Sequence, residues 1–189
     1  LLKSGEEIIE ELFPGIIQEL SLNGAKKSDF AGDLLWSHHG TQKTRFASNV
    51  IISQQSRPLL EWQIQQRLEK IPNIHFRFGC RVQDLLFNND EINRIVFEEA
   101  DGTVTELLAD LVVDASGAAA LHNQWLRDSG YDIPPKTEVK VNLFYASMVY
   151  KELSHAPMDW HSLLAYPNPP EIDRGEIGRA SCRERVSTP

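Results

Sequence analysis

The stretch that decides the fold class reads Ala109-Asp110-Leu111-Val112-Val113-Asp114-Ala115-Ser116-Gly117. Its apolar run at 111–113 is short and continuous, which is typical of a strand buried on both faces of a parallel sheet. Open α/β sheets bind ligands at the carboxyl ends of such strands. Asp114, Ala115, Ser116 and Gly117 are therefore candidate ligand contacts, because small residues allow close approach and Gly117 tolerates unusual backbone angles. The alternative is a plain strand-to-helix turn capped by Asp114 or Ser116.

Helical patterns lie on both sides of this stretch. Apolar residues recur at helical spacing over 6–13 and 16–20, and Asn23-Gly24 is a stop signal. Ser56 is a good N-cap for a helix that has Pro58 in its first turn and ends before Pro72. A further helix is expected after Gly117, with Leu121, Trp125 and Leu126 on its apolar face.

Strand patterns fill most of the remaining sequence. The segments expected to be strands are 34–38, 43–47, 49–54, 75–79, 81–87, 92–99, 104–108 and 139–150. The pair 81–87 and 92–99 is joined by Asn88-Asn89-Asp90-Glu91, and Asp101-Gly102 is a turn signal. We expect an antiparallel sheet built from two halves, around 31–55 and 139–175. The order of elements predicts a mixed α/β (α+β) fold with this sheet inserted into it.

Composition and charge exclude several classes of protein. The chain has 189 residues, of which 41% are hydrophobic, as in an ordinary globular domain. Its net charge of −8 argues against a general nucleic-acid binder. No apolar run approaches the roughly 20 residues that cross a bilayer, so no transmembrane segment is expected. With only Cys80 and Cys182, a disulfide framework is not expected and a cytoplasmic location is the default.

The two ends of the sequence lead us to expect a piece of a longer gene product. Residues 176–186 resemble the translation of a sequencing-adapter read-through, so 176–189 is interpreted as a non-native tail. A polar, disordered native tail is the alternative. The chain begins with Leu1 rather than with methionine, which indicates truncation at that end as well.

A second candidate ligand contact is Arg57, in the stretch Gln54-Gln55-Ser56-Arg57-Pro58-Leu59-Leu60. It is predicted to lie at a helix N-terminus, where the helix dipole and the free N–H groups favour anions. A guanidinium at this place suits a phosphate or an anionic ring. The alternative is a surface arginine paired with a neighbouring acid.

Four stretches together resemble a known family, the FAD-dependent oxidoreductases of the aromatic-ring hydroxylase type, which have the p-hydroxybenzoate hydroxylase fold. The sequence is most similar to the 2-polyprenyl-6-methoxyphenol hydroxylase-like branch. The stretches are 1–5 running into 11–15, Gln55 to Glu61, Gly79-Cys80-Arg81-Val82, and Asp110 to Gly117. The resemblance spans about 1–175, and the order and spacing of the four stretches carry it.

The resemblance implies cofactors and contacts. It implies FAD, with NADH or NADPH as co-substrate, and it implies that Arg57 lies by the flavin and its ribityl–phosphate chain. It further implies that the backbone at Val82 contacts the adenine and that residues 114–117 pack near the dinucleotide. Relatives continue after this loop with Arg and Ser, whereas this chain has Ala118-Ala119-Ala120, which weakens the case for nicotinamide contact there. The chain contains no Gly-x-Gly-x-x-Gly, so tight FAD binding by this piece alone is not expected.

The activity implied for the parent protein is that of a monooxygenase, in which NAD(P)H reduces FAD and O2 is used to hydroxylate an aromatic or polyketide-like small molecule. The alternatives are other flavin chemistry on the same fold, such as prenyl-chain reduction or halogenation, and a non-catalytic binding remnant. No Trp-x-Trp-x-Ile element, which would favour a halogenase, occurs in the chain. The catalytic residues are unknown at this level, and this piece alone is expected to be inactive.

The resemblance implies an organisation in five segments. These are a helical segment of the FAD domain at 1–24, the first part of the substrate-domain sheet at 25–55, the central FAD-binding part at 56–130, the second part of the sheet at 131–175, and the tail at 176–189. Candidate residues for the wall of the substrate pocket are Trp36, His38, Phe144 and Tyr145.

Other polar residues favour structural roles. His38-His39 have no carboxylate or cysteine at a metal-ligand spacing, so no metal site is expected. Cys80 has no histidine or Cys-x-x-Cys partner and is expected to be a buried structural residue. The acidic helix that carries Glu6, Glu7, Glu10 and Glu11 is expected to present a solvated face.

Overall fold

A computed structural model gives the fold. It describes residues 2–88, 91–117, 122–133, 135, 137–141, 144, 146–148, 159–167 and 175–179. The chain divides into two compact units, Leu1–Ile74 with Ser147–Pro189 and His75–Ala146, and each is considered by itself. Helices and strands both occur, which confirms the mixed α/β class. The five-segment organisation stays a prediction, because contacts within this chain do not test membership of a flavin domain.

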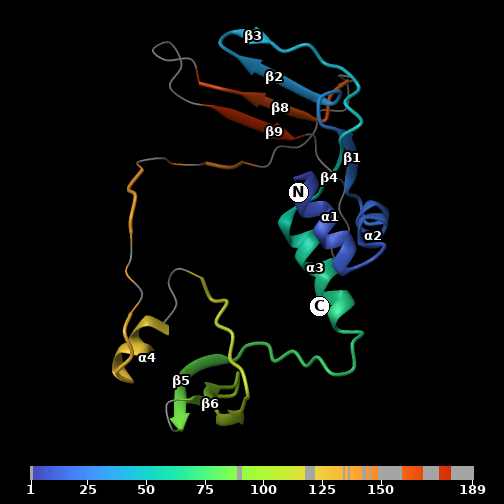
Figure 1. The fold of residues 1–189 in the computed structure, drawn as a ribbon. Helices are drawn as coiled ribbons and strands as arrows, with labels where there is room; N and C mark the ends of the chain where they lie inside the picture. The colour runs from blue at the N-terminus through green and yellow to red at the C-terminus, as the bar shows by residue number, and fades with distance from the viewer. Residues whose placement is uncertain are drawn as a thin grey trace. The chain divides into compact units, whose positions relative to one another are not determined.

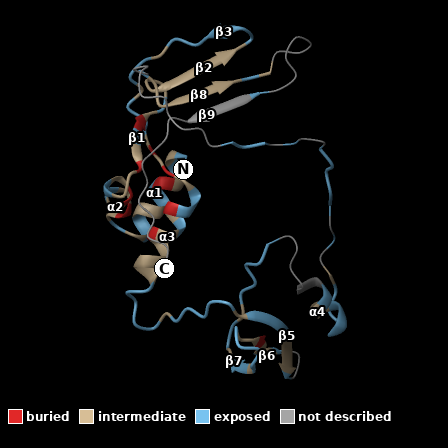
Figure 2. Cartoon of the chain, turned by 180° about the vertical axis from the view of Figure 1, so that it is seen from behind, coloured by how far each residue is buried: buried red, intermediate tan, exposed pale blue. Residues whose placement is uncertain are grey.

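Three helices carry the core of the first unit (Figures 1 and 2). They are α1 (Lys3–Leu12), α2 (Ile16–Leu22) and α3 (Arg57–Leu68). The buried cluster consists of Ile16, Leu20, Ala25 and Leu59, and Ile9, Phe13, Ile17, Leu60, Trp62 and Ile64 pack against it. The predicted signals are confirmed: Ser56 Oγ accepts a hydrogen bond from Leu59 N at 3.2 Å, and α2 ends at Leu22, with Asn23 as its C-cap.

The acidic face of α1 is not simply solvated, which corrects that expectation. Glu6 is buried, and its carboxylate accepts a hydrogen bond from Ser53 N at 2.6 Å. Glu10 accepts hydrogen bonds from Gly15 N at 2.6 Å and from Ile17 N at 3.0 Å. These bonds satisfy donors at the start of α2, which Pro14-Gly15 separates from α1, and they hold the pKa of Glu10 below its ordinary value.

Two small sheets complete the first unit. Strand β1 (Lys26–Asp29) pairs antiparallel with β4 (Ile51–Gln54). The larger sheet has the order β3-β2-β8-β9, from Thr41–Gln42, Leu34–His38, Ser162–Ala165 and Glu176–Arg179. It joins segments from both predicted halves, but β2 and β8 run parallel, so the antiparallel prediction is wrong for that pair. Strand β9 lies in the segment interpreted as a non-native tail; edge pairing uses main-chain groups and so does not test that interpretation.

The predicted strand over 43–47 is absent, and the one over 49–54 is shortened to β4. The shortening at the start of 49–54 is due to a competing acceptor, because the carboxylate of Asp29 takes hydrogen bonds from Ser48 N and Asn49 N. Asn49 also has a left-handed backbone, with φ of 59°. Backbone donors that are bound by a side chain cannot join a strand ladder.

The second unit contains a three-stranded antiparallel sheet and one described helix. Its strands are β5 (Arg81–Asn88), β6 (Glu91–Glu98) and β7 (Val104–Leu108), in the order β5-β6-β7. The hairpin and the Asp101-Gly102 turn confirm the prediction, and Phe97 is buried on β6. The helix α4 (His122–Asp128) confirms the predicted helix around Trp125 and Leu126.

Three strand predictions in the second unit are wrong for the described residues. Residues 75–79 are irregular, and Phe76 and Phe78 stack on each other with ring centroids 5.7 Å apart instead of joining a ladder. The run at 111–113 is not a strand, and Leu111 and Val113 are 79% and 77% exposed. The described residues of 139–148 also form no strand. Apolar runs and alternation produce strands only where a neighbouring strand and a layer cover them, and the described part of this unit supplies neither.

Candidate functional site

An aromatic group on the larger sheet is the feature that best matches a predicted site. Trp36 and His38 both lie on β2, and Tyr166 follows β8, the parallel neighbour of β2. The ring centroid of Tyr166 lies 6.0 Å from that of Trp36 and 5.0 Å from that of His38. His39 stacks on His38 at 4.1 Å. The structure therefore brings together two of the four predicted wall residues and adds Tyr166, which the sequence analysis did not select.

The other two predicted wall residues do not join this group. Phe144 belongs to the second unit and is 91% exposed there, and Tyr145 lies outside the described residues. Their proposed role at a substrate therefore stays a prediction.

Desolvation lowers the pKa of His38, and the charges of His39 and Lys43 act in the same direction. The imidazole of His38 is therefore neutral at pH 7, because its ordinary pKa is already about 6.5. A neutral imidazole can both donate and accept a hydrogen bond, which suits a group that lines a ligand site.

An apolar cavity of about 260 Å³ lies beside Trp36 in the first unit. It is formed by the end of β1, the β1–β2 turn, β2 and the irregular segment 43–50. The residues that line it are Phe30, Ala31, Leu34, Trp36, Lys43, Thr44, Phe46, Ser48 and Val50. Lys43 Nζ lies 4.4 Å from the centroid of the Trp36 ring, in a cation–π arrangement.

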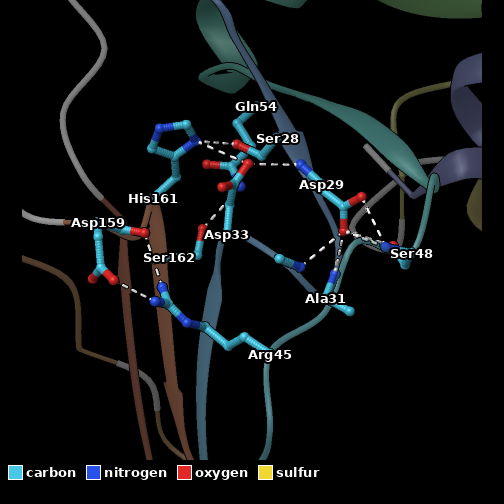
Figure 3. Close-up of polar contacts among 11 residues, drawn as sticks. Ser28, Asp29, Ala31, Asp33, Arg45, Ser48, Gln54, Asp159, His161 and Ser162 are labelled. Carbon is cyan, nitrogen blue, oxygen red and sulfur yellow. Dashed lines mark hydrogen bonds and ion pairs between the residues drawn. The ribbon is translucent and has the colours of Figure 1, made fainter.

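Asp29 fixes the segment that forms one side of this cavity (Figure 3). Its Oδ1 accepts hydrogen bonds from Ala31 N at 3.0 Å, Gly32 N at 2.8 Å and Ser48 Oγ at 2.7 Å. Its Oδ2 accepts hydrogen bonds from Ser48 N at 3.0 Å and from Asn49 N at 2.9 Å. The hydrogen bond from Ser48, followed by that from Gly32, holds the pKa of Asp29 far below its ordinary value.

Asp29→Asn is expected to destabilise the first unit at neutral pH, because one amide oxygen cannot replace two carboxylate oxygens that share these donors. A lowered folded-state pKa contributes stability that is complete above the unfolded pKa, about 3.9, and is lost as the pH falls below it. The difference between wild type and variant should therefore be full at pH 7 and shrink towards pH 3. Urea unfolding across this range measures it, with the exposed Asp132→Asn as control. A difference that does not depend on pH would contradict the assignment.

Ser28, Asp33 and His161 lie in one polar cluster, but they do not form a catalytic triad (Figure 3). Ser28 Oγ lies 2.7 Å from His161 Nδ1, and Asp33 Oδ2 lies 3.5 Å from the same nitrogen. A triad needs the nucleophile and the orienting acid on different nitrogens of the histidine ring, whereas here both are closest to Nδ1. Ser28 is also buried, and the backbone oxygen of Asp33 accepts hydrogen bonds from His161 N and Ser162 N. The cluster therefore ties the start of β8 to the β1–β2 turn.

Two further contacts attach β8 and the residues before it to the rest of the first unit. Gln54 Nε2 donates to Ser162 Oγ at 2.9 Å, and Arg45 Nη1 donates to the backbone oxygen of Asp159 at 2.8 Å. Arg45 also forms an ion pair with the Asp159 carboxylate, which lowers the pKa of that acid. These contacts join residues more than 100 positions apart, and they support the parallel pairing of β2 with β8.

Arg57 lies at the first position of α3, as predicted. Its Nε lies 2.6 Å from Glu61 Oε1, and its side chain is 86% exposed. This hydrogen-bonded pair raises the pKa of Arg57. The arrangement matches the alternative of a surface arginine paired with an acid, while contact with a flavin stays a prediction.

The second unit contains the other residues predicted to contact the cofactor, Val82 and 114–117, and their backbone is accessible. Val82 is on β5, which pairs only with β6 among the described strands, next to a register shift between Val82 and Asp84. Asp114 Oδ1 accepts hydrogen bonds from Ser116 N at 2.9 Å and from Ser116 Oγ, so residues 114–116 form a local turn. Ala115 is exposed within it. Gly117 has φ of 87°, and no atom lies within 4 Å of the place where a Cβ would be.

A second, more open cavity of about 450 Å³ adjoins the stretch that leads to this turn. Its lining mixes apolar and acidic side chains from β5, β6 and the region of α4. The residues are Phe87, Glu91, Ile92, Asp110, Leu111, Val112, Leu126 and Tyr131.

The described part of the chain has neither a metal-ligand grouping nor a membrane-spanning helix. Within it, no three or more His, Cys, Asp or Glu side chains are grouped so as to hold a metal ion. None of the described helices has the length and apolar character that crossing a bilayer requires. Cys80 is half-buried, with its Sγ 3.7 Å from the backbone oxygen of Phe78.

Comparison with known proteins shows a distant similarity. No family model matches the chain. The chain is 26% identical over 166 aligned residues to Protein Rv3254 of Mycobacterium tuberculosis. The match covers 80% of this chain and 34% of that protein, so the chain spans about a third of its relative's length. The relative's name states no activity.

Proposed function

We propose that the chain is part of an FAD-dependent oxidoreductase, a monooxygenase that hydroxylates an aromatic or polyketide-like small molecule with NAD(P)H and O2. The observation that carries the proposal is the order and spacing of the four family-like stretches, which run from residue 1 to Gly117. The aromatic group of Trp36, His38 and Tyr166 beside an apolar cavity supports it, because ligand sites are concave, mostly apolar and lined by aromatic side chains.

The residues proposed to hold the cofactor fit that role individually. The guanidinium of Arg57 is exposed at the N-terminus of a 12-residue helix, and its pair with Glu61 is of the exposed kind that contributes about 1 kcal/mol or less. An anionic phosphate chain can therefore replace Glu61. Val82 offers backbone groups on an edge strand, and the space around Gly117 is open.

When bound, FAD would supply the redox chemistry, accepting reducing equivalents from NADH or NADPH and reacting with O2. The protein's own residues would bind, orient and shield the reactants. His38, neutral at pH 7, would hydrogen-bond a polar group of the substrate, and Trp36 with Tyr166 would cover its apolar body.

The test is to express the open reading frame that encodes this chain from its genomic locus, across both ends, and to record the visible absorbance. Flavin absorbance, with FAD released on denaturation, is the expected result, followed by NAD(P)H oxidation that aromatic substrates stimulate. A colourless protein that takes up no added FAD would contradict the proposal and favour a non-catalytic binding protein. Reduction of a prenyl chain, or halogenation, would keep the flavin and change the reaction.

Arg57→Gln in that protein is expected to raise the dissociation constant of FAD by about 10-fold or more, because a charged hydrogen bond contributes about 1.5–3 kcal/mol. Lys70→Gln removes the same charge from an exposed position at the end of α3 and should leave FAD binding unchanged. Fluorescence titration with FAD measures both. Equal dissociation constants for the two variants would remove Arg57 from the cofactor site.

A further inference from the structure

The cavity beside Trp36 combines an apolar lining with one positive charge. Among the residues that line it, Phe30, Leu34, Phe46 and Val50 are apolar, and Lys43 is the one charged side chain. We propose that this cavity binds a small organic anion with a flat apolar body, with its charged group next to Lys43. If the ligand of this cavity is the substrate of the enzyme, the proposal rests on the proposed function and implies that the substrate is negatively charged.

The charge of Lys43 is available to a ligand. In the described part of the chain its Nζ lies over the Trp36 ring, and none of the ion pairs described there involves it. The cavity lining contains no carboxylate. A cation that lines an apolar cavity and has no counter-ion in that lining favours an anionic ligand over a cationic ligand of equal size.

The Trp36 side chain, which lines the cavity, also has an unpaired polar atom. Its Nε1 is buried and has no hydrogen-bond partner within the described part of the chain. Buried donors are normally paired, and such an exception calls for a ligand or another partner.

The size of the cavity and the exposure of its walls define the apolar part of the ligand. An engineered cavity of about 150 Å³ holds benzene, and this one, at about 260 Å³, has room for one or two fused rings. Phe46 is 63% exposed and Phe30 is 42% exposed. A ring system placed between them would remove this surface from water, which favours binding.

The walls of the cavity are held in place before any ligand binds. The segment 43–50 is irregular, but Asp29 binds Ser48 and Asn49, and Lys43 N donates to the backbone oxygen of Trp36 at 2.8 Å. A site whose walls are fixed in advance loses less conformational entropy on binding. Asp29→Asn should therefore weaken ligand binding as well as stability.

The probes are 1-naphthoate and its neutral analogue 1-naphthamide, titrated by calorimetry into the chain without FAD. The expected result is tighter binding of 1-naphthoate, by about 5-fold, because one charge pair near the surface contributes about 1 kcal/mol. Lys43→Gln should reduce 1-naphthoate binding to the level of 1-naphthamide and leave 1-naphthamide unchanged. Lys70→Gln, which removes a charge elsewhere in the same unit, should change neither.

A second pair of variants tests the apolar wall. Phe46→Ala should weaken both probes by a similar factor, whereas Phe78→Ala, at a phenylalanine of matching exposure (67%) in the second unit, should weaken neither. Circular dichroism checks that each variant is folded. Equal binding of the two probes, equal effects of Lys43→Gln and Lys70→Gln, or no binding to the folded chain would each overturn the proposal.

This outcome is separate from that of the flavin test. Binding is measured without FAD, so a gene product that is colourless but selects 1-naphthoate would contradict the flavoenzyme and keep the anion site. A flavin-containing protein that binds 1-naphthoate and 1-naphthamide equally well would support the flavoenzyme and contradict the anion site.

Discussion

Leu59→Ala is expected to lower the free energy of unfolding of the first unit by about 2–5 kcal/mol. Leu59 is fully buried on α3, where it packs into the cluster that contains Ile16, Leu20 and Ala25. The cluster is small, so few neighbouring side chains can move into the space that the substitution opens. Urea unfolding followed by far-ultraviolet circular dichroism measures the loss, because three of the four described helices belong to this unit.

Leu22→Ala is the matched control for this prediction. Leu22 is also a helical leucine in the same unit, but it is 74% exposed at the end of α2. Its truncation should change the free energy of unfolding by about 0.5 kcal/mol or less. Similar losses in the two variants would mean that α3 does not pack on α2 as described.

Signals that are local in sequence correctly predicted several helix ends and turns. Ser56 with Pro58 marks the start of α3, Asn23-Gly24 marks the end of α2, and Asp101-Gly102 makes the β6–β7 turn. Each works within a few residues, through a cap, a fixed φ or a permitted positive φ, so no distant contact is needed.

Features that depend on distant residues were predicted only in part: the two halves of the larger sheet were expected to join, but not the parallel direction of β2 and β8. The parallel pairing of β2 with β8 joins residues more than 120 positions apart, and the aromatic group needs it, since it brings Tyr166 to Trp36 and His38. The apolar run at 111–113 shows the opposite case. Its composition is typical of a buried strand, but composition does not supply the neighbouring strands that make one.

Side chains that bind backbone donors were also missed, because charge patterns do not reveal them. Asp29 precedes a turn and offers no motif, yet its carboxylate organises two loops and one side of the cavity. Glu6 and Glu10 were grouped with Glu7 and Glu11 as one solvated face, although only the second pair is exposed. The four acids occupy the same sequence positions whether all of them are solvated or two of them bind backbone donors, so the pattern does not distinguish the two cases.

Glu6→Ala is expected to destabilise the first unit by about 1–3 kcal/mol, because Ser53 N, on the buried part of β4, loses a charged acceptor that lies 2.6 Å away. The ion pair of Glu6 with Lys3, at 3.0 Å, is lost as well, but Lys3 is partly exposed and contributes less. Glu6→Gln keeps an acceptor oxygen and loses the charge, so an intermediate loss is expected.

Glu7→Ala separates the role of this buried contact from the general effect of removing an acid from α1. Glu7 is the next residue on the same helix, its side chain is 65% exposed, and it lies 3.9 Å from the same Lys3. Its removal should change stability by about 0.5 kcal/mol or less. Amide hydrogen exchange at Ser53 should accelerate in Glu6→Ala and stay unchanged in Glu7→Ala. If the two variants exchange Ser53 at the same rate, the carboxylate of Glu6 is not the acceptor of the Ser53 N–H.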